Sequence, residues 1–169
     1  MPPGSHGIPA DVVARNQRER LVAAMAEVCA ERGYAEVAVA DVVKRAGVST
    51  VTFYQQFADK RDCVLAAHRQ LLGRLLEAVD PAGGARAIVH DTLALLAADP
   101  PSARLLTVEV HAVGQEGAKR HDAMVRAFAE RLGADWILVA GMLALIGKLV
   151  VAGEAARLPE LEAELVALL

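Results

Sequence analysis

Helical hydrophobic periodicity, interrupted at intervals by glycine and proline, constrains the fold of this sequence more than any other feature. Leu21, Met25 and Val28 recur on one helical face, and Gly33 stands where a left-handed residue would end the helix. Stretches that alternate apolar and polar residues, as half-buried strands do, are missing from the sequence. The sequence therefore predicts an all-α protein.

The expected helices follow from this periodicity and from the residues that cap it. A short helix is expected at 39–46 before Gly47, and another begins after Ser49, whose hydroxyl suits an N-cap. A long helix is expected from Asp59 to Val79. Further helices are expected at 85–98, 101–113, 117–132, 135–152 and 159–169.

One stretch, 136–152, is apolar on every side and has Lys148 as its only charge. Its 17 residues are at the short limit for a membrane span. A helix of this kind also suits a buried subunit interface. The interface is the favoured interpretation, so no membrane partner is expected. The short join at 132–136 leaves open whether a tight turn precedes this helix.

Charge is distributed unevenly along the 169 residues. Residues 1–74 carry 10 Lys and Arg against 8 Asp and Glu, whereas residues 75–169 carry 8 against 13. A basic excess in the N-terminal part has the sign that nucleic-acid binding requires, although an excess of two is small. Residues 1–14 lack the pattern of a secretory signal and are expected to be a flexible lead, so the expected compartment is cytoplasmic.

Two short helices joined by a turn at Gly47 are typical of a helix-turn-helix motif. Phe53 and Phe57 define the buried face of the second of these helices. Val51 and Gln55 then lie nearly opposite, on the exposed face. Three further polar side chains flank them: Thr50, Thr52 and Tyr54.

The side chains on this exposed face have the chemistry that reads DNA. Gln55 suits bidentate bonding to adenine, and Val51 suits contact with a thymine methyl group. Lys60 would add its charge to the free N–H groups at the start of the next helix, and both favour a phosphate. From spacing alone, an ordinary helical hairpin with a solvated polar face remains a second interpretation.

The segment from Arg18 to about Ala67 resembles the N-terminal DNA-binding domain of the TetR/AcrR family of transcriptional regulators. The match covers about 50 residues in order and spacing. The residues that carry it are Ala24, Glu31-Arg-Gly-Tyr34, Val39-Ala-Asp-Val-Val43, Ala46-Gly-Val-Ser49, Phe53-Tyr54, Phe57 and Lys60.

The resemblance implies a three-helix DNA-binding domain at 15–62 and a C-terminal helical domain at 63–169 that binds a ligand and dimerises. It implies a ligand-responsive regulator, in particular a repressor that a small hydrophobic effector releases from a pseudo-palindromic double-stranded DNA operator. The recognition helix would supply Thr50, Val51, Thr52, Tyr54, Gln55 and Gln56. Phosphate contacts would come from Tyr54, Lys60, Arg15, Arg18 and Lys44, with Arg45 close to the backbone.

Two positions depart from the family pattern. The family often has glycine or another small residue where this chain has Val51, and Thr or Ser where it has Ala38. The missing hydroxyl at Ala38 removes a helix cap worth about 1 kcal/mol. These departures leave an alternative open: a helical small-molecule binding and dimerisation protein with a weakened DNA-binding helix.

The resemblance also implies a homodimer formed through the last two long helices. The residues expected at that interface are Ala140, Leu143, Ala144, Ile146, Gly147, Val150, Leu161 and Leu165. The residues expected to bind the effector are His68, His90, Leu95, Arg104, Val108, Glu109, Met124, Phe128, Trp136 and Met142. Aromatic residues make up only 4% of the chain, which favours an aliphatic or acyl-type effector over a planar cation held by stacking.

Catalysis and metal binding are disfavoured. Two His-Asp pairs are adjacent in the sequence, but neighbouring side chains on a helix point about 100° apart. No nucleophile motif or metal-ligand spacing accompanies them. Cys29 and Cys63 are expected to be small core residues. The sequence predicts neither an enzyme nor a cofactor.

Overall fold

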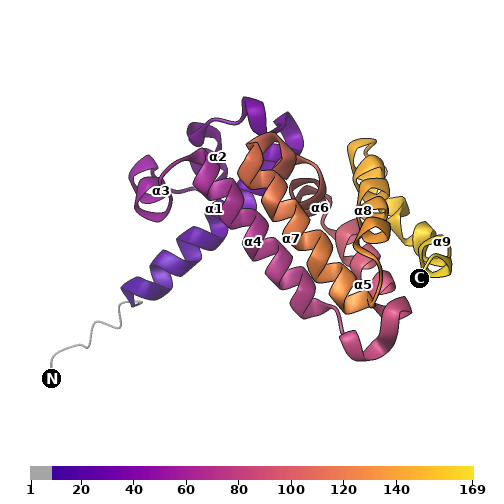
Figure 1. Cartoon of the computed structure of the whole chain (residues 1–169). Coiled ribbons are helices and arrows are strands. Elements are labelled where there is room, and N and C mark those ends of the chain that lie inside the picture. Colours follow the sequence, from indigo (N-terminus) through magenta and orange to yellow (C-terminus); the bar gives the residue numbers. More distant parts are fainter. Residues whose placement is uncertain (1–8) are drawn as a thin grey trace, which may run out of the picture.

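The structure is a computed structural model that describes residues 9–169, and within that range it consists of helices and turns without a strand (Figure 1). The α-helices are α1 (Ala10–Arg32), α2 (Val39–Ala46), α3 (Thr50–Gln56), α4 (Lys60–Ala78), α5 (Gly84–Ala98), α6 (Pro100–Thr107), α7 (Gln115–Leu132), α8 (Trp136–Val151) and α9 (Glu162–Ala167). Four 3₁₀ segments join them: η1 (Tyr34–Glu36), η2 (Pro81–Gly83), η3 (Glu109–Val113) and η4 (Ala155–Leu161). The predicted all-α fold class is confirmed.

Helix α1 begins earlier than the sequence analysis expected. Residues 1–8 of the expected lead lie outside the described residues, but 10–14 form the first turns of α1, which project from the body of the molecule (Figure 1). The Pro9 carbonyl accepts the N–H groups of Val12 and Val13, and Asp11 places a negative charge in the first turn. The predicted boundary of the lead, 1–14, is therefore wrong at its C-terminal end.

Helices α2 and α3 form the expected helix-turn-helix. Gly47 ends α2 with φ 62°, a left-handed conformation in which its N–H donates to the Lys44 carbonyl. Ser49 then caps α3, because its Oγ accepts the Thr52 N–H at 3.0 Å. Ala38 has no side-chain oxygen with which to cap α2. The Asp41 carboxylate accepts the Ala38 N–H at 3.1 Å, which supplies one of the two hydrogen bonds of a capping box.

Helix α4 connects the two parts of the molecule. Asp59 caps it by accepting the Asp62 N–H at 2.7 Å, and Asp62 accepts the Ala58 N–H in return. The helix packs on α1 at one end and on α6 and α7 further along. The expected boundary between residues 62 and 63 falls inside this helix, so α4 belongs to both parts.

Two of the expected C-terminal helices are shorter than predicted. The helix expected at 101–113 ends at Thr107, because Val108 leaves the helical region at φ −123° and ψ −63° and η3 follows. The helix expected at 159–169 is mostly the 3₁₀ segment η4, with Pro159 inside it, before the short α9. Proline lacks an N–H and disfavours the preceding α-helical turn, which accounts for the second difference.

The join between α7 and α8 is a tight turn. Gly133 adopts φ 63° and the Ala134 N–H donates to the Ala129 carbonyl, which ends α7. Within residues 9–169, no single helix is long and apolar enough to cross a membrane. Only α7 and α8 taken together meet the length and composition, and they are bent by 115° at the join.

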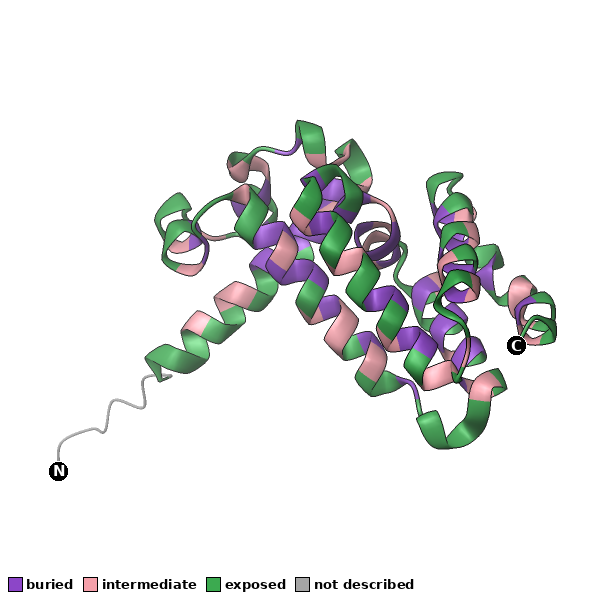
Figure 2. Cartoon of the chain, in the orientation of Figure 1, coloured by how far each residue is buried: buried purple, intermediate pink, exposed green. Residues whose placement is uncertain are grey.

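One continuous core runs through the molecule. Leu21, Met25 and Phe53 are fully buried between α1 and α3, and Leu105 and Met124 are buried among the later helices. Burial is concentrated where helices meet, whereas α3 and the first turns of α1 are largely exposed (Figure 2). Both cysteines are buried and free, which confirms their prediction as core residues.

Candidate nucleic-acid interface and apolar cavity

Helix α3 presents one side to solvent and buries the other. Phe53 is fully buried, while the side chains of Val51 and Tyr54 are 67% and 57% exposed. Thr50 and Gln55 are exposed as well. Because the exposed residues share one face, a groove of DNA would meet Gln55, Thr50 and Val51 without unfolding the helix. Thr52 and Gln56 are half-buried at its edges.

Arg18 supports α3 from within the chain. Its Nη1 donates to the Gln56 carbonyl at 2.9 Å, and its guanidinium lies 4.3 Å from the centre of the Phe57 ring. The bond satisfies a carbonyl at the C-terminal end of α3, where positive charge is also favourable. Arg18, which was predicted to contact a phosphate, therefore also stabilises α3 within the chain. The sequence did not indicate this second role.

Lys60 is also engaged within the chain. Its Nζ donates to the carbonyls of Tyr34 at 3.0 Å and Val37 at 2.9 Å, and lies 4.4 Å from the centre of the Tyr34 ring. An ammonium group has three donors, and a longer bond of 3.4 Å to the Ala35 carbonyl uses the third. In this structure Lys60 holds η1 against α4, and a phosphate would have to compete with those carbonyls.

Other cations near α3 have more open surroundings. Lys44 at the end of α2 and Arg61 in the first turn of α4 are exposed, and neither side chain has a hydrogen bond or ion pair within residues 9–169. Arg45, by contrast, binds Glu27 and Glu31 of α1 at 2.8 Å and 2.7 Å. Sequence reasoning did not include Arg61; its position beside Lys60 was the available signal.

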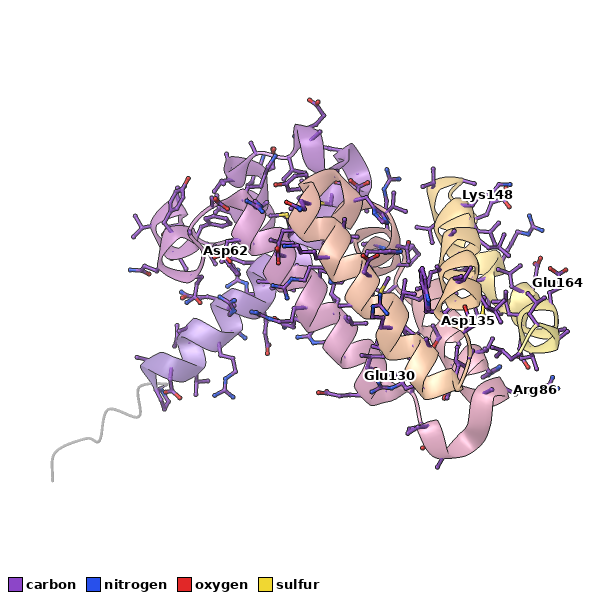
Figure 3. The ribbon with its side chains drawn as sticks, viewed as in Figure 1. Asp62, Arg86, Glu130, Asp135, Lys148 and Glu164 are labelled. Atoms are coloured by element: carbon purple, nitrogen blue, oxygen red, sulfur yellow. The ribbon has the colours of Figure 1, made fainter. Side chains whose placement is uncertain are left out.

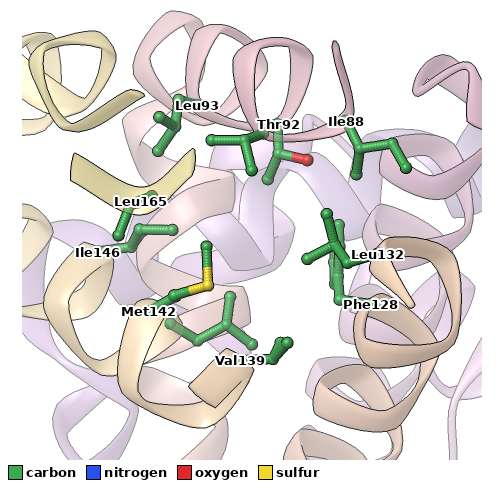
Figure 4. Close-up of a pocket in the computed structure, with 11 residues that line it drawn as sticks. Ile88, Thr92, Leu93, Phe128, Leu132, Val139, Met142, Ile146 and Leu165 are labelled. Carbon is green, nitrogen blue, oxygen red and sulfur yellow. The ribbon is translucent and has the colours of Figure 1, made fainter. Parts of the chain in front are cut away.

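An apolar cavity lies in the C-terminal part, between α5, α7, α8 and α9 (Figure 4). Its volume is only about 30 Å³, so the cavity is narrow. Its walls are Ile88, Val89, Thr92, Leu93, Phe128, Leu132, Val139, Met142, Leu143, Ile146 and Leu165. Thr92 is the one polar side chain among them, and its buried Oγ1 has no hydrogen-bond partner within residues 9–169.

Helix α9 covers one side of this cavity with Leu165 and is held to α5 by polar contacts. Glu162 accepts bonds from Arg86 at 2.9 Å and pairs with His90 at 2.8 Å. The bond to His90 lowers the pKa of Glu162, and the carboxylate raises the pKa of His90 in turn. Arg86 and Glu164 lie at the end of the molecule opposite Asp62 (Figure 3).

The cavity contains few of the residues predicted to bind an effector. Only Phe128 and Met142 line it. His90, Leu95 and Trp136 are exposed, Val108 is half-buried, and Arg104 pairs with Glu109. His68, Met124 and Glu109 are buried elsewhere. Apart from Phe128 and Met142, these residues therefore do not line this cavity, because sequence spacing did not show which faces of α5, α7 and α8 converge.

Most of the residues predicted for the dimer interface, on α8, η4 and α9, are buried or half-buried within the chain. Leu143, Ile146 and Leu165 line the cavity, Val150 is buried, and Gly147 packs against Thr107 of α6. Ala140 and Leu161 are half-buried, and Ala144 alone is exposed. A helix that is apolar on every side carries no sequence signal for which face is inside.

A cluster of histidines lies between α4, η3 and α7. His68 of α4 is 1% exposed, and neither ring nitrogen has a hydrogen-bond partner within residues 9–169. The rings of His111 and His121 lie near it, with centres 4.3 Å apart and planes tilted by 52°. Burial, reinforced by the nearby positive groups His121 and Arg120, lowers the pKa of His68 to about 4. In the part of the chain that the structure describes, no three His, Cys, Asp or Glu side chains are placed to hold a metal ion.

Glu109, one of the residues predicted to bind the effector, lies outside the cavity. It is only 6% exposed, and its Oε1 accepts the Arg104 Nε–H at 2.8 Å. Its Oε2 accepts the Tyr34 N–H at 2.7 Å. Both oxygens are therefore occupied by partners inside the chain, one of them on the turn that follows α1.

Comparison with known proteins agrees with this geometry. Residues 21–67, which contain most of α1, all of α2 and α3 and the start of α4, match the model of the bacterial regulatory proteins of the tetR family. The N-terminal part of the chain therefore matches the tetR family of bacterial regulatory proteins. The resemblance inferred from Ala46-Gly-Val-Ser49 and the residues around it is confirmed.

One curated relative of this chain is a regulator of fatty acid metabolism. The fatty acid metabolism regulator protein of Bacillus subtilis (strain 168) is 30% identical over 77 residues, which are 46% of this chain and 40% of that relative. The chain thus matches less than half of the length of this curated relative.

Two solved structures share the fold over most of both chains. The fatty acid degradation regulator FadR from Bacillus halodurans has a TM-score of 0.76 and 20% identity, covering 90% of this chain and 93% of that one. FadR from Bacillus subtilis in complex with stearoyl-CoA has a TM-score of 0.75 and 21% identity, covering 89% and 96%. At these identities the likeness shows a shared fold and nothing beyond it.

Proposed function

We propose that this chain is a sequence-specific, DNA-binding transcriptional regulator whose operator binding responds to an apolar small molecule, and that it acts in the cytoplasm as a repressor rather than as an enzyme. The observation that carries the proposal is α3, a short helix whose one face is buried through Phe53 and whose other face exposes Val51, Tyr54 and Gln55. The match of residues 21–67 to the tetR family supports the same role.

In the proposed complex, α3 enters the major groove. Gln55 bonds to a base edge, Val51 meets a thymine methyl, and Thr50 reaches a base or a phosphate. Tyr54 and the exposed Lys44 and Arg61 bind phosphates. The half-buried Thr52 and Gln56 play a smaller part, since Thr52 Oγ1 already bonds to Ser49 Oγ.

We further propose a homodimer that pairs the outer face of α8 with its copy. That face exposes Ile137, Gly141, Ala144, Lys148 and Val151, which recur at helical spacing and are apolar or small except for Lys148. Ile137 and Val151 are 65% and 55% exposed, an unusual exposure for large apolar side chains in one stripe. The small residues allow a close approach, and a two-fold axis here would place two α3 helices on a pseudo-palindromic operator.

The apolar cavity is the proposed effector site, and a long acyl chain is the proposed class of ligand. Ten of its eleven walls are aliphatic, sulfur-containing or aromatic, with Thr92 as the exception. A relative of the same fold is solved in complex with stearoyl-CoA. Because the cavity is narrow here, an acyl chain would have to separate α5 from α8 to enter.

A second candidate function is a helical small-molecule binding protein with a weakened DNA-binding helix. It is supported by the internal engagement of Arg18, Arg45 and Lys60, which leaves few exposed cations to meet phosphates. The two candidates differ in the strength, sequence preference and salt dependence of DNA binding.

The experiment that tests the proposed function selects binding sites from a random duplex library with the purified chain. The affinity for the enriched duplex is then measured against a scrambled duplex across a salt series. We expect an inverted repeat to be enriched, with at least about a thousandfold preference. Weak binding that ignores sequence would exclude the operator-binding regulator and favour the second candidate.

A further inference from the structure

The bond between Glu109 and Tyr34 is the one hydrogen bond within residues 9–169 that joins the part before α4 to the part after it. Other polar contacts of the N-terminal part stay within it or end on α4, as Lys60 and Arg74 show. Burying a carboxylate costs free energy unless it is paired and hydrogen-bonded. Both carboxylate oxygens of the buried Glu109 are hydrogen-bonded, so the position of this side chain depends on Arg104 and Tyr34 together.

On the N-terminal side, the bond reaches the turn that positions the helix-turn-helix. Tyr34 begins η1, and α2 follows at Val39. The Tyr34 N–H binds Glu109, while its carbonyl accepts the Lys60 ammonium of α4 at 3.0 Å. A shift of Glu109 relative to α4 would therefore act on η1 and on the helices connected to it.

On the C-terminal side, Glu109 is connected to the walls of the cavity. Val139 and Ile146 of α8 line the cavity. The adjacent Gly147 faces Thr107, which lies two residues before Glu109, and a Cβ added at Gly147 would be 3.6 Å from Thr107. Segment η3 also lies tightly on α7, since a Cβ at Gly117 would be 1.8 Å from the Val110 carbonyl oxygen. Movement of α8 or α7 at the cavity would therefore reach η3 through close packing, which transmits displacement rather than absorbing it.

We propose that Glu109 is the positioning residue through which occupation of the cavity changes the placement of the helix-turn-helix. The inference rests on the proposed function. Opening the cavity moves α8 and α6, the Glu109 carboxylate withdraws from the Tyr34 N–H, and η1 is then held by Lys60 alone. The switch therefore has two states: in one the Tyr34 N–H is bonded to Glu109, and in the other it is released. Glu109 does not itself contact the effector or DNA.

The test uses the full chain, the selected operator duplex and stearoyl-CoA as the probe, and compares wild type with Glu109→Gln. Glutamine keeps the shape but has one oxygen, so its amide NH₂ must face a donor of Arg104 or Tyr34. We expect stearoyl-CoA to weaken operator binding of the wild type by about 5–150-fold. In Glu109→Gln that factor should fall to less than a third, while stearoyl-CoA affinity stays within about twofold.

The matched control is Glu130→Gln on the exposed surface of α7, which removes the same charge far from η1 (Figure 3). It should respond to stearoyl-CoA as the wild type does. If Glu109→Gln retains the full response, the inference is wrong and the proposed function is unaffected. A wild type that binds no operator, or that stearoyl-CoA does not release, would overturn both.

A second measurement does not depend on any variant. Hydrogen exchange at the Tyr34 amide of the wild type should accelerate at least about fivefold when stearoyl-CoA binds, because the amide loses its acceptor. The Val37 amide, which donates to the Tyr34 carbonyl inside η1, is the internal reference. Unchanged protection of Tyr34 at saturating stearoyl-CoA would overturn the inference even if Glu109→Gln fails to fold.

Discussion

In the N-terminal part, which extends from α1 to the start of α4, the buried side chains pack closely and polar side chains hold short helices in place; in the C-terminal part, apolar helices line a narrow cavity. Phe53 is fully buried on the inner side of α3, Arg18 binds the Gln56 carbonyl at the end of α3, and Lys60 binds the Val37 carbonyl after η1. Around the cavity, Thr92 is the one polar wall and has no partner within the described residues. This difference is consistent with an N-terminal part that keeps one shape and a C-terminal part that binds a ligand.

A matched pair of valines tests this difference with the largest expected effect. Val42 of α2 is fully buried in the N-terminal part, and Val139 of α8 is 2% exposed but faces the cavity. We expect Val42→Ala to lower the free energy of unfolding by about 2–3 kcal/mol and Val139→Ala by about half of that, because Val139 already lacks neighbours on one side. Denaturant unfolding at one protein concentration measures both. Equal losses would contradict the contrast in packing.

Acidification should weaken the chain through His68. Its pKa is about 4 in the folded chain and about 6.5 when unfolded, so its full contribution is present above pH 6.5 and is lost as pH falls from 6.5 to 4. At pH 5 the loss is about 2 kcal/mol. His111, His121 and Arg120 face it and add repulsion if they are charged.

Unfolding by denaturant at pH 7.5 and pH 5 measures this effect. In His68→Leu the difference between the two pH values should shrink by about 2 kcal/mol. In His90→Gln it should not shrink, because the raised pKa of His90 stabilises the folded chain as pH falls. If His68→Leu shows the same acid weakening as the wild type, another group is responsible.

Arg18→Met tests the bracing of α3. The variant keeps most of the apolar stem but loses the bond to the Gln56 carbonyl and the contact with the Phe57 ring. We expect about 1–2 kcal/mol of lost unfolding free energy in the absence of DNA. The control is Arg15→Met on the exposed side of α1, which should change stability by less than about 0.5 kcal/mol. Similar stability of the two variants would mean that Arg18 does not brace α3.

The smallest expected effect comes from a matched pair of threonines. Thr92→Val removes a buried hydroxyl that has no partner within residues 9–169, and should raise the free energy of unfolding by up to about 1 kcal/mol. Thr107 Oγ1 donates to the Ala103 carbonyl at 2.8 Å, so Thr107→Val should lower it by about 1 kcal/mol. The same sign for both variants would show that Thr92 has a partner after all.

The N-terminal part was predictable because its signals are local. Gly47, Ser49 and the spacing of Phe53 and Phe57 specify a turn, a cap and a buried face within a dozen residues. What spacing did not reveal was the engagement of Arg18 and Lys60. Their carbonyl partners on Gln56, Tyr34 and Val37 become neighbours only when the helices pack together.

The C-terminal part was predictable in fold class but not in its site. Leu143 and Ile146 have the same chemistry as Ile137 and Val151, and only the packing of α5, α7 and α9 decides which pair faces the cavity. Glu109 carried a real signal, since a carboxylate in an apolar stretch requires a partner. One of its two partners, Arg104, is five residues away, but the other is a backbone N–H 75 residues away, which no local pattern encodes.

The most direct test of the central proposal measures the affinity of stearoyl-CoA for the free chain and for the chain saturated with its selected operator duplex. If the filled cavity and operator binding belong to different states of one molecule, linkage requires stearoyl-CoA to bind the operator complex more weakly. The factor should equal that by which stearoyl-CoA weakens operator binding, about 5–150-fold. Equal affinity for the free and operator-bound chain would contradict the proposal, because the cavity would then have no influence on α3.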